Sequence, residues 1–170
     1  FDLQKIADAI TIHTKIIYLA NPNNPTGTIF TRAEFDAFWK RVPSHVLIIL
    51  DEAYFEYARQ NPEFPDSMTY RYDNVITLRT FSKAYGIAGV RIGYGFAHDE
   101  LITNVLKVKL PFEPSTLAQA AGIGALGDTE FLELTLKTNN EGKTFLAREL
   151  EGLGLHPIPT EANFYCVPVE

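Results

Sequence analysis

Hydrophobic residues gather along the chain into short runs that predict the strands of a covered sheet. The first three runs are short and apolar on both faces, which is typical of strands in a covered parallel sheet. The first three runs are also rich in β-branched residues. The predicted strands are Ile16–Ala20, Val46–Leu50, Val75–Leu78 and Arg91–Ala97, and one more is expected over Asn163–Val169.

A helical pattern separates the first two predicted strands, as a parallel crossover requires. Thr31 and Glu34 have the spacing of a capping box. The apolar positions of one helix face follow at Phe35, Phe38, Trp39 and Val42. Further helices are predicted over 99–109, 116–126 and 129–153, the last with Gly154 as its stop. The predicted class is α/β, with a central, mostly parallel sheet and helices on both faces.

Composition and charge narrow the classes of function. The chain has 170 residues and a formal net charge of -6, without the clustered Lys and Arg that nucleic-acid or membrane-surface binding favours. No apolar run approaches the roughly 20 residues that span a bilayer. The single Cys166 excludes an internal disulfide framework and fits a reducing compartment, so we expect a cytoplasmic protein. Both chain ends look cut, which predicts a partial chain.

Polar side chains follow three consecutive predicted strands. The segments are NPNNPTG (21–27), DEAY (51–54) and FSKAYG (81–86), and Arg91 comes eight positions after Lys83. Ligands of open α/β sheets bind beyond the carboxyl ends of the strands. We therefore expect an amide, a carboxylate with a phenol, and a hydroxyl pair with a lysine to meet at one sheet edge.

At these segments the chain resembles the class I and II aminotransferases of fold type I, which depend on pyridoxal 5'-phosphate (PLP), and most closely their histidinol-phosphate branch. The resemblance extends through TFSKAYGIAGVRIGY (80–94), KVKLPFEPSTLAQAA (107–121) and EANFYCV (161–167). It implies that residues 1–128 are part of the incomplete PLP-binding large domain. Residues 129–170 would be the interdomain helix and the beginning of a small C-terminal α/β domain. It also implies a homodimer.

The resemblance assigns catalytic roles to Lys83, Asp51 and Tyr54. Lys83 would hold PLP as a Schiff base and shuttle a proton during the reaction. Asp51 would pair with the protonated pyridine nitrogen and keep the ring an electron sink. Tyr54 and Asn24 would hydrogen-bond the cofactor's phenolic oxygen. Taken alone, Lys83 reads as a surface lysine, Asp51 as a strand-end cap and Asn24 as a turn residue.

The remaining cofactor contacts follow from the same resemblance. Ala53 would pack against one face of the ring, and Thr80, Ser82 and Arg91 would hold the phosphate through two hydroxyls and a guanidinium. Without its context, Arg91 reads as a sheet-edge salt bridge. The four histidines are scattered without ligand spacing, so no metal site is predicted.

The implied activity is transfer of an amino group between a small-molecule donor and a 2-oxo acid. The donor would be an amino acid or amino-alcohol phosphate, histidinol phosphate-like or aromatic, and the acceptor 2-oxoglutarate. Two alternatives stay open: a PLP-dependent decarboxylase of the threonine-phosphate type, and a catalytically inactive fragment that serves only as a structural unit. The family's arginine for the substrate carboxylate and its ring-stacking aromatic have no counterpart in this chain.

Overall fold

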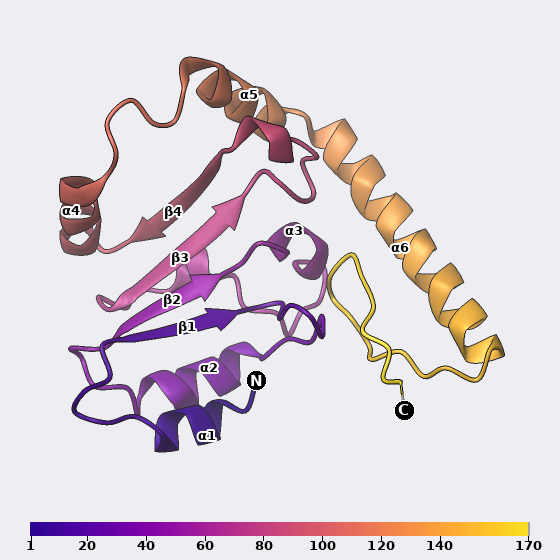
Figure 1. Cartoon of the computed structure of the whole chain (residues 1–170), viewed down its shortest axis with the longest axis horizontal. Helices are drawn as coiled ribbons and strands as arrows, with labels where there is room; N and C mark the ends of the chain where they lie inside the picture. The colour runs from indigo at the N-terminus through magenta and orange to yellow at the C-terminus, as the bar shows by residue number, and fades with distance from the viewer. Residues whose placement is uncertain (170) are drawn as a thin grey trace.

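A four-stranded sheet forms the centre of the computed structural model, which describes residues 1–169 (Figure 1). The strand order follows the sequence, and the first three strands are parallel, whereas the fourth runs antiparallel to the third. The predicted α/β class with a mostly parallel sheet is confirmed. The strands are β1 (Ile16–Ala20), β2 (Leu47–Asp51), β3 (Val75–Thr80) and β4 (Gly93–Ala97).

The crossover between β1 and β2 contains helix α2 (Arg32–Trp39), whose start is fixed by the predicted capping box. The Thr31 side chain accepts a hydrogen bond from the backbone N–H of Glu34, and the Glu34 side chain accepts one from the backbone N–H of Thr31. Helix α1 (Leu3–Asp8), which the sequence pattern did not predict, packs against α2 below the sheet (Figure 1). The largest core cluster joins both helices to the sheet; its buried members include Leu3, Phe30, Phe35, Phe38, Ile17, Leu19, Ile48 and Leu50.

The two faces of β1 are not equally covered. Ile17 and Leu19 point into the core, whereas Ile16 and Tyr18 on the other face are 58% and 54% exposed. Because residues paired across parallel strands share a face, the pairing of Ala20 with Asp51 places the Asp51 side chain on the open face.

Three helices follow the sheet, each at the predicted place: α4 (Asp99–Val108), α5 (Thr116–Gly127) and α6 (Thr129–Gly152). Gly154 follows α6 with a φ of +77°, as its predicted role as a helix stop requires. After α6 the chain turns back and runs beside the short helix α3 (Phe55–Ala58) (Figure 1). Two short 3₁₀ helices, Ser67–Thr69 and Ala88–Val90, complete the elements.

Two details of the sequence prediction were wrong. The segment Asn163–Val169 forms no strand, because no strand of the described residues pairs with it; a single hydrogen bond joins the Ile158 N–H to the Cys166 carbonyl, at 2.8 Å. The strand expected from Arg91 begins at Gly93, because Arg91 has a left-handed φ of 58° and ends the preceding 3₁₀ helix. The division into 1–128 and 129–170 stays a prediction.

A buried ion pair joins the ends of β2 and β3. The Arg79 guanidinium donates through Nε and Nη2 to one oxygen of Glu52, at 2.9 and 2.8 Å, and Nη2 also donates to Asp66 at 2.8 Å. The guanidinium lies 3.3 Å from the centroid of the Phe55 ring. Arg79 therefore links the loop that contains Asp66 to Glu52, the residue that follows Asp51 in the sequence.

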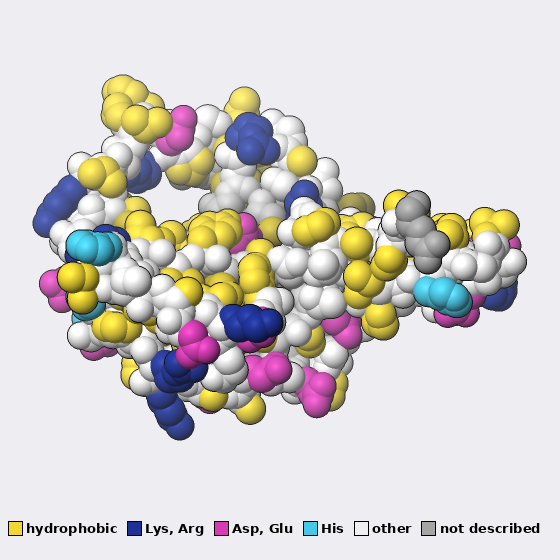
Figure 2. All heavy atoms as spheres, turned by 60° about the horizontal axis from the view of Figure 1, so that its bottom comes forward, with side chains coloured by type: hydrophobic (Ala, Val, Ile, Leu, Met, Phe, Trp, Pro, Cys, Tyr) yellow, Lys and Arg dark blue, Asp and Glu magenta, His cyan; other side chains and the backbone are white. Residues whose placement is uncertain are grey.

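The surface mixes side chains of all kinds. On the face shown in Figure 2, Lys and Arg side chains are dispersed among hydrophobic and acidic ones. Among residues 1–169, no helix has the length and apolar character needed to cross a membrane.

Candidate active site

The loops after β1, β2 and β3 lie side by side at one edge of the sheet, here called the rim. Backbone hydrogen bonds extend the ladder beyond the strands: Asn21 N–H donates to the Asp51 carbonyl at 3.0 Å, and Glu52 N–H to the Leu78 carbonyl at 2.9 Å. The expected meeting of the three polar segments at one edge is therefore confirmed.

Two of the predicted site residues are directly bonded at the rim. Asn24 Nδ2 donates to the Tyr54 hydroxyl oxygen at 3.2 Å, although the two residues are 30 positions apart. The Lys83 side-chain nitrogen lies 5.4 Å from the centroid of the Tyr54 ring, within the range of a cation–π contact. Tyr54 is buried and Lys83 is exposed, so the phenol is a fixed element beside an accessible amine.

The Asp51 carboxylate has hydrogen-bond donors on both oxygens. The Ala53 backbone N–H donates to Oδ1 at 3.1 Å, and the Tyr18 hydroxyl donates to Oδ2. The partial desolvation of Tyr18, followed by the hydrogen bond to Asp51 and the charge of that carboxylate, raises the pKa of Tyr18 to about 12. The phenol therefore keeps its proton near neutral pH and remains a donor.

The loop that presents Lys83 is closed by local hydrogen bonds. The Ser82 N–H donates to Thr80 Oγ1 at 3.1 Å, and the Gly86 N–H donates to the Lys83 carbonyl at 3.0 Å. Gly86 adopts a φ of +70°, which a side chain would disfavour. Ala84 is fully buried beside Tyr54 in a second core cluster, so the backbone on which Lys83 is mounted is anchored.

Arg91 occupies a different setting from the other predicted residues. Its guanidinium donates through Nη1 to the Ala88 carbonyl at 2.7 Å, and the residue is exposed. No hydrogen bond joins Arg91 to Thr80 or Ser82 in the described part of the chain. The structure thus connects Asn24 with Tyr54 and Lys83, Asp51 with Ala53, and Thr80 with Ser82.

The returning C-terminal segment packs onto the rim. The Glu161 N–H donates to the Gly27 carbonyl at 2.8 Å, and a Cβ on Gly27 would lie 1.9 Å from Thr160 Oγ1. The Phe164 ring meets the Tyr54 ring edge-on, with centroids 5.2 Å apart. This segment is distant from Tyr54 in the sequence but lies beside it in space, and it bounds the rim on that side.

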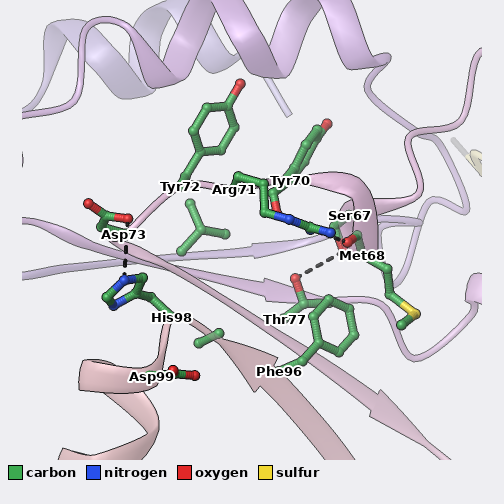
Figure 3. A pocket seen from close by; sticks show the side chains of 12 residues that line it. Ser67, Met68, Tyr70, Arg71, Tyr72, Asp73, Thr77, Phe96, His98 and Asp99 are labelled. Atoms are coloured by element: carbon green, nitrogen blue, oxygen red, sulfur yellow. Dashed lines mark hydrogen bonds and ion pairs between the residues drawn. The ribbon is translucent and has the colours of Figure 1, made fainter.

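A cavity of about 480 Å³ lies elsewhere, beside the amino end of β3 and below the loop 67–73 (Figure 3). It contains none of the predicted site residues. A hydrogen bond from Thr77 to Ser67 and a contact of His98 with Asp73 cross its lining, and the Tyr70 and Tyr72 side chains point away from it. The candidate site is therefore identified by the functional groups that meet at the rim, and not by this cavity.

Sequence reasoning missed the parts of the site that depend on contacts between distant segments. Tyr18 carried a usable signal, because it lies two positions before a strand end on the same face as Ala20, the register partner of Asp51. Phe164 carried none beyond its position in the EANFYCV segment, and Thr160, directly before that segment, carried none.

Comparison with known proteins decides the family. The model of the family "Aminotransferase class I and II" matches residues 1–169. The chain belongs to the class I and II aminotransferases. The resemblance expected from the sequence motifs is therefore confirmed.

Relatives within the aminotransferase family share close to half of the chain's residues. Histidinol-phosphate aminotransferase 2 of Carboxydothermus hydrogenoformans is 45% identical over 99% of this chain and 47% of its own length. The aromatic amino acid aminotransferase of Corynebacterium efficiens is 48% identical over 99% of this chain and 48% of its own length. The chain spans about half the length of the curated relatives it matches.

A solved aminotransferase structure has the same fold. The histidinol-phosphate aminotransferase of Sinorhizobium meliloti, in complex with pyridoxal-5'-phosphate, superposes with a TM-score of 0.90 at 35% identity, over 98% of this chain and 45% of that one. The donor set at the rim fits the same cofactor. It offers an accessible amine, a carboxylate held on both oxygens, and an amide–phenol pair.

Proposed function

We propose that the protein is a PLP-dependent aminotransferase and that its cofactor binds at the rim. The observation that carries this proposal is the cluster of Asn24, Tyr54 and Lys83, with Asp51 on the neighbouring strand end. An aldehyde cofactor needs an amine for covalent attachment, and a pyridine ring needs an acid at its nitrogen. Successive strands bring both groups to the same edge.

Lys83 is the residue that binds the cofactor covalently and moves a proton at the substrate. PLP supplies an electron sink when bound. The exposed position of the Lys83 amine, on a backbone anchored by buried Ala84, leaves it accessible to both cofactor and substrate. A positioned acid/base of this kind contributes about 10²–10⁴-fold in rate.

The other site residues orient the ring. Asp51 would accept the pyridine N–H and Ala53 would pack against the ring, while the Ala53 backbone N–H holds the Asp51 carboxylate. The Tyr54 hydroxyl accepts a hydrogen bond from Asn24, so its own hydrogen points elsewhere and can serve the phenolic oxygen. The Asp51 oxygens each keep a free lone pair and the Tyr54 hydroxyl keeps its hydrogen, so both groups can still bond the cofactor.

The phosphate binds beside the start of the Lys83 loop. Thr80 Oγ1 accepts the Ser82 N–H, which leaves the Thr80 hydroxyl proton for a phosphate oxygen. Ser82 supplies a second hydroxyl. Arg91 supplies the guanidinium, which would exchange its bond to the Ala88 carbonyl for a charge-assisted bond to the phosphate dianion.

The substrates follow from the relatives' names. The proposed donor is histidinol phosphate or an aromatic amino acid, because proteins with both names match 99% of this chain. The proposed acceptor is a 2-oxo acid such as 2-oxoglutarate. We also propose a homodimer, as the family resemblance implies. A cytoplasmic location is proposed as well, and the lone Cys166 supports it.

The function is tested by single-turnover spectroscopy of the protein loaded with PLP. Addition of histidinol phosphate or tyrosine should convert bound cofactor to its pyridoxamine form, and 2-oxoglutarate should reverse the change. Release of carbon dioxide from an amino-acid substrate would instead indicate the decarboxylase alternative. If PLP causes no new visible absorption with purified protein, the structural-unit alternative is favoured and the proposal fails.

A further inference from the structure

Tyr18 makes a polar contact at the rim that the roles above leave unused. It lies on β1 two positions before the strand end, on the face that it shares with Ala20 and Asp51. Its hydroxyl donates to Asp51 Oδ2 across the β1–β2 boundary. The register of the two strands therefore brings a phenol from one strand to the acid at the end of the next.

The second oxygen of Asp51 is held from a different direction. Oδ1 accepts the Ala53 N–H, which lies two residues further along the same chain segment. A carboxylate with donors on both oxygens has its side-chain torsions fixed, and each oxygen retains a lone pair for another donor. Asp51 is only half-buried, so that further donor can approach from the open face of the sheet.

We infer that Tyr18 is a positioning residue, which orients the Asp51 carboxylate toward the pyridine nitrogen of the cofactor. This inference rests on the proposed function. Because the Tyr18 phenol retains its proton near neutral pH, it stays a donor over the range in which an aminotransferase works.

Packing among residues 1–169 does not account for the Tyr18 side chain. More than half of it is exposed, and it belongs to none of the core clusters in the described residues. A second tyrosine–aspartate pair in the same chain shows the contrast: the Tyr72 hydroxyl donates to Asp36 at 2.9 Å, but its ring stacks on Trp39 and packs against the core. Tyr72 thus provides a matched control with the same two functional groups and no contact with the rim.

The test compares Tyr18→Phe with Tyr72→Phe in protein loaded with PLP that carries ¹⁵N in its ring. We expect Tyr18→Phe to move the ring ¹⁵N resonance toward that of unprotonated pyridine and to weaken PLP binding about 3- to 10-fold, as loss of a hydrogen bond to a charged group predicts. Tyr72→Phe should leave both unchanged. An unaltered ring resonance in Tyr18→Phe overturns the inference, and equal shifts in both variants also overturn it.

A measurement without cofactor separates this inference from the proposed function. Three-bond NMR couplings of Asp51 report its χ1 rotamer in the cofactor-free protein. We expect a single rotamer in the wild type and in Tyr72→Phe, and averaging in Tyr18→Phe. A single unchanged rotamer in Tyr18→Phe contradicts the positioning role. Failure of the wild type to bind PLP contradicts only the proposed function, and the rotamer measurement still tests whether Tyr18 orients Asp51.

Discussion

The side-chain nitrogen of Lys83 lies 5.4 Å from the centroid of the Tyr54 ring. The hydroxyl of that ring accepts a hydrogen bond from Asn24, so side chains from the loops after β1, β2 and β3 form one connected group. The connection requires parallel strands in register, because each loop must leave the sheet at the same edge. The fold thus brings Lys83 close to Tyr54, and the proposed cofactor site is built around these two side chains.

Substitution of Tyr54 by Phe should change the protonation of the bound cofactor. Loss of the phenol donor leaves more negative charge on the cofactor's phenolic oxygen, which favours the protonated form of the neighbouring Lys83 nitrogen. We expect the pH midpoint of the visible absorption change to rise by about one unit, since a hydrogen bond to a charged group is worth about 1.5 kcal/mol. A spectroscopic pH titration measures it.

Tyr70→Phe is the control for that substitution. The Tyr70 hydroxyl is buried without a hydrogen-bond partner among residues 1–169, so its removal should leave the titration unchanged and should not lower stability. An unmoved midpoint in Tyr54→Phe would contradict the proposed contact between Tyr54 and the cofactor.

Gly27→Ala should destabilise the protein and release the C-terminal segment from the rim. The new Cβ would lie 1.9 Å from Thr160 Oγ1, and Gly27 has a φ of +72°. Overpacking and left-handed backbone strain together predict a loss of about 2–4 kcal/mol in the free energy of unfolding, measured by urea denaturation.

The matched control is Gly142→Ala on α6, where an added Cβ meets nothing within 4 Å. This substitution should raise the free energy of unfolding by about 0.5–1 kcal/mol, because alanine favours a helix over glycine. Equal stability of Gly27→Ala and the wild type would show that Thr160 does not pack on Gly27.

The buried pair of Arg79 and Glu52 predicts non-additive substitutions. Arg79→Met leaves the Glu52 carboxylate buried without its partner and should cost about 3–5 kcal/mol in the free energy of unfolding. Replacement of both residues, Arg79→Met with Glu52→Leu, should recover most of this loss. A double-mutant cycle in urea measures the coupling, and simple addition of the two single effects would refute the pair's role.

Stability should depend on pH through Glu56, which is 2% exposed. Burial raises the pKa of the Glu56 carboxyl above its ordinary value of 4.5, and the charges of Arg79 and Arg59 offset part of this effect. The folded state therefore binds the proton more tightly than the unfolded state. The resulting stability is fully present below pH 4.5 and is lost as the pH rises through the raised folded-state pKa.

Glu56→Gln removes this dependence. As the pH increases from 4.5 toward neutrality, the wild type should lose unfolding free energy relative to Glu56→Gln. Glu63→Gln, which removes an exposed carboxyl, keeps Glu56 and should therefore retain the pH dependence that Glu56 causes. Parallel curves for Glu56→Gln and the wild type would mean that the Glu56 carboxyl titrates alike in both states.

Most of the sheet and the rim was predictable because the signals were local. Apolar runs identify β1, β2 and β3, and polar segments directly follow their ends. The partnership of Tyr18 with Asp51 was not predictable, since it depends on the register of β1 against β2. The run 163–169 has the composition of a strand, but a strand forms only where a neighbour supplies hydrogen bonds. The setting of Arg91 depends on its left-handed backbone, which its sequence context does not indicate.

The central claim is that Lys83 binds PLP covalently at the rim. Incubation with PLP, reduction with borohydride and peptide mapping by mass spectrometry identify the modified lysine directly. We predict a pyridoxyl-phosphate adduct on Lys83 in the wild type and in Lys137→Ala, an exposed control on α6, and its absence in Lys83→Ala. Stoichiometric adduct on another lysine, or equal labelling of Lys83→Ala and the wild type, would contradict the account.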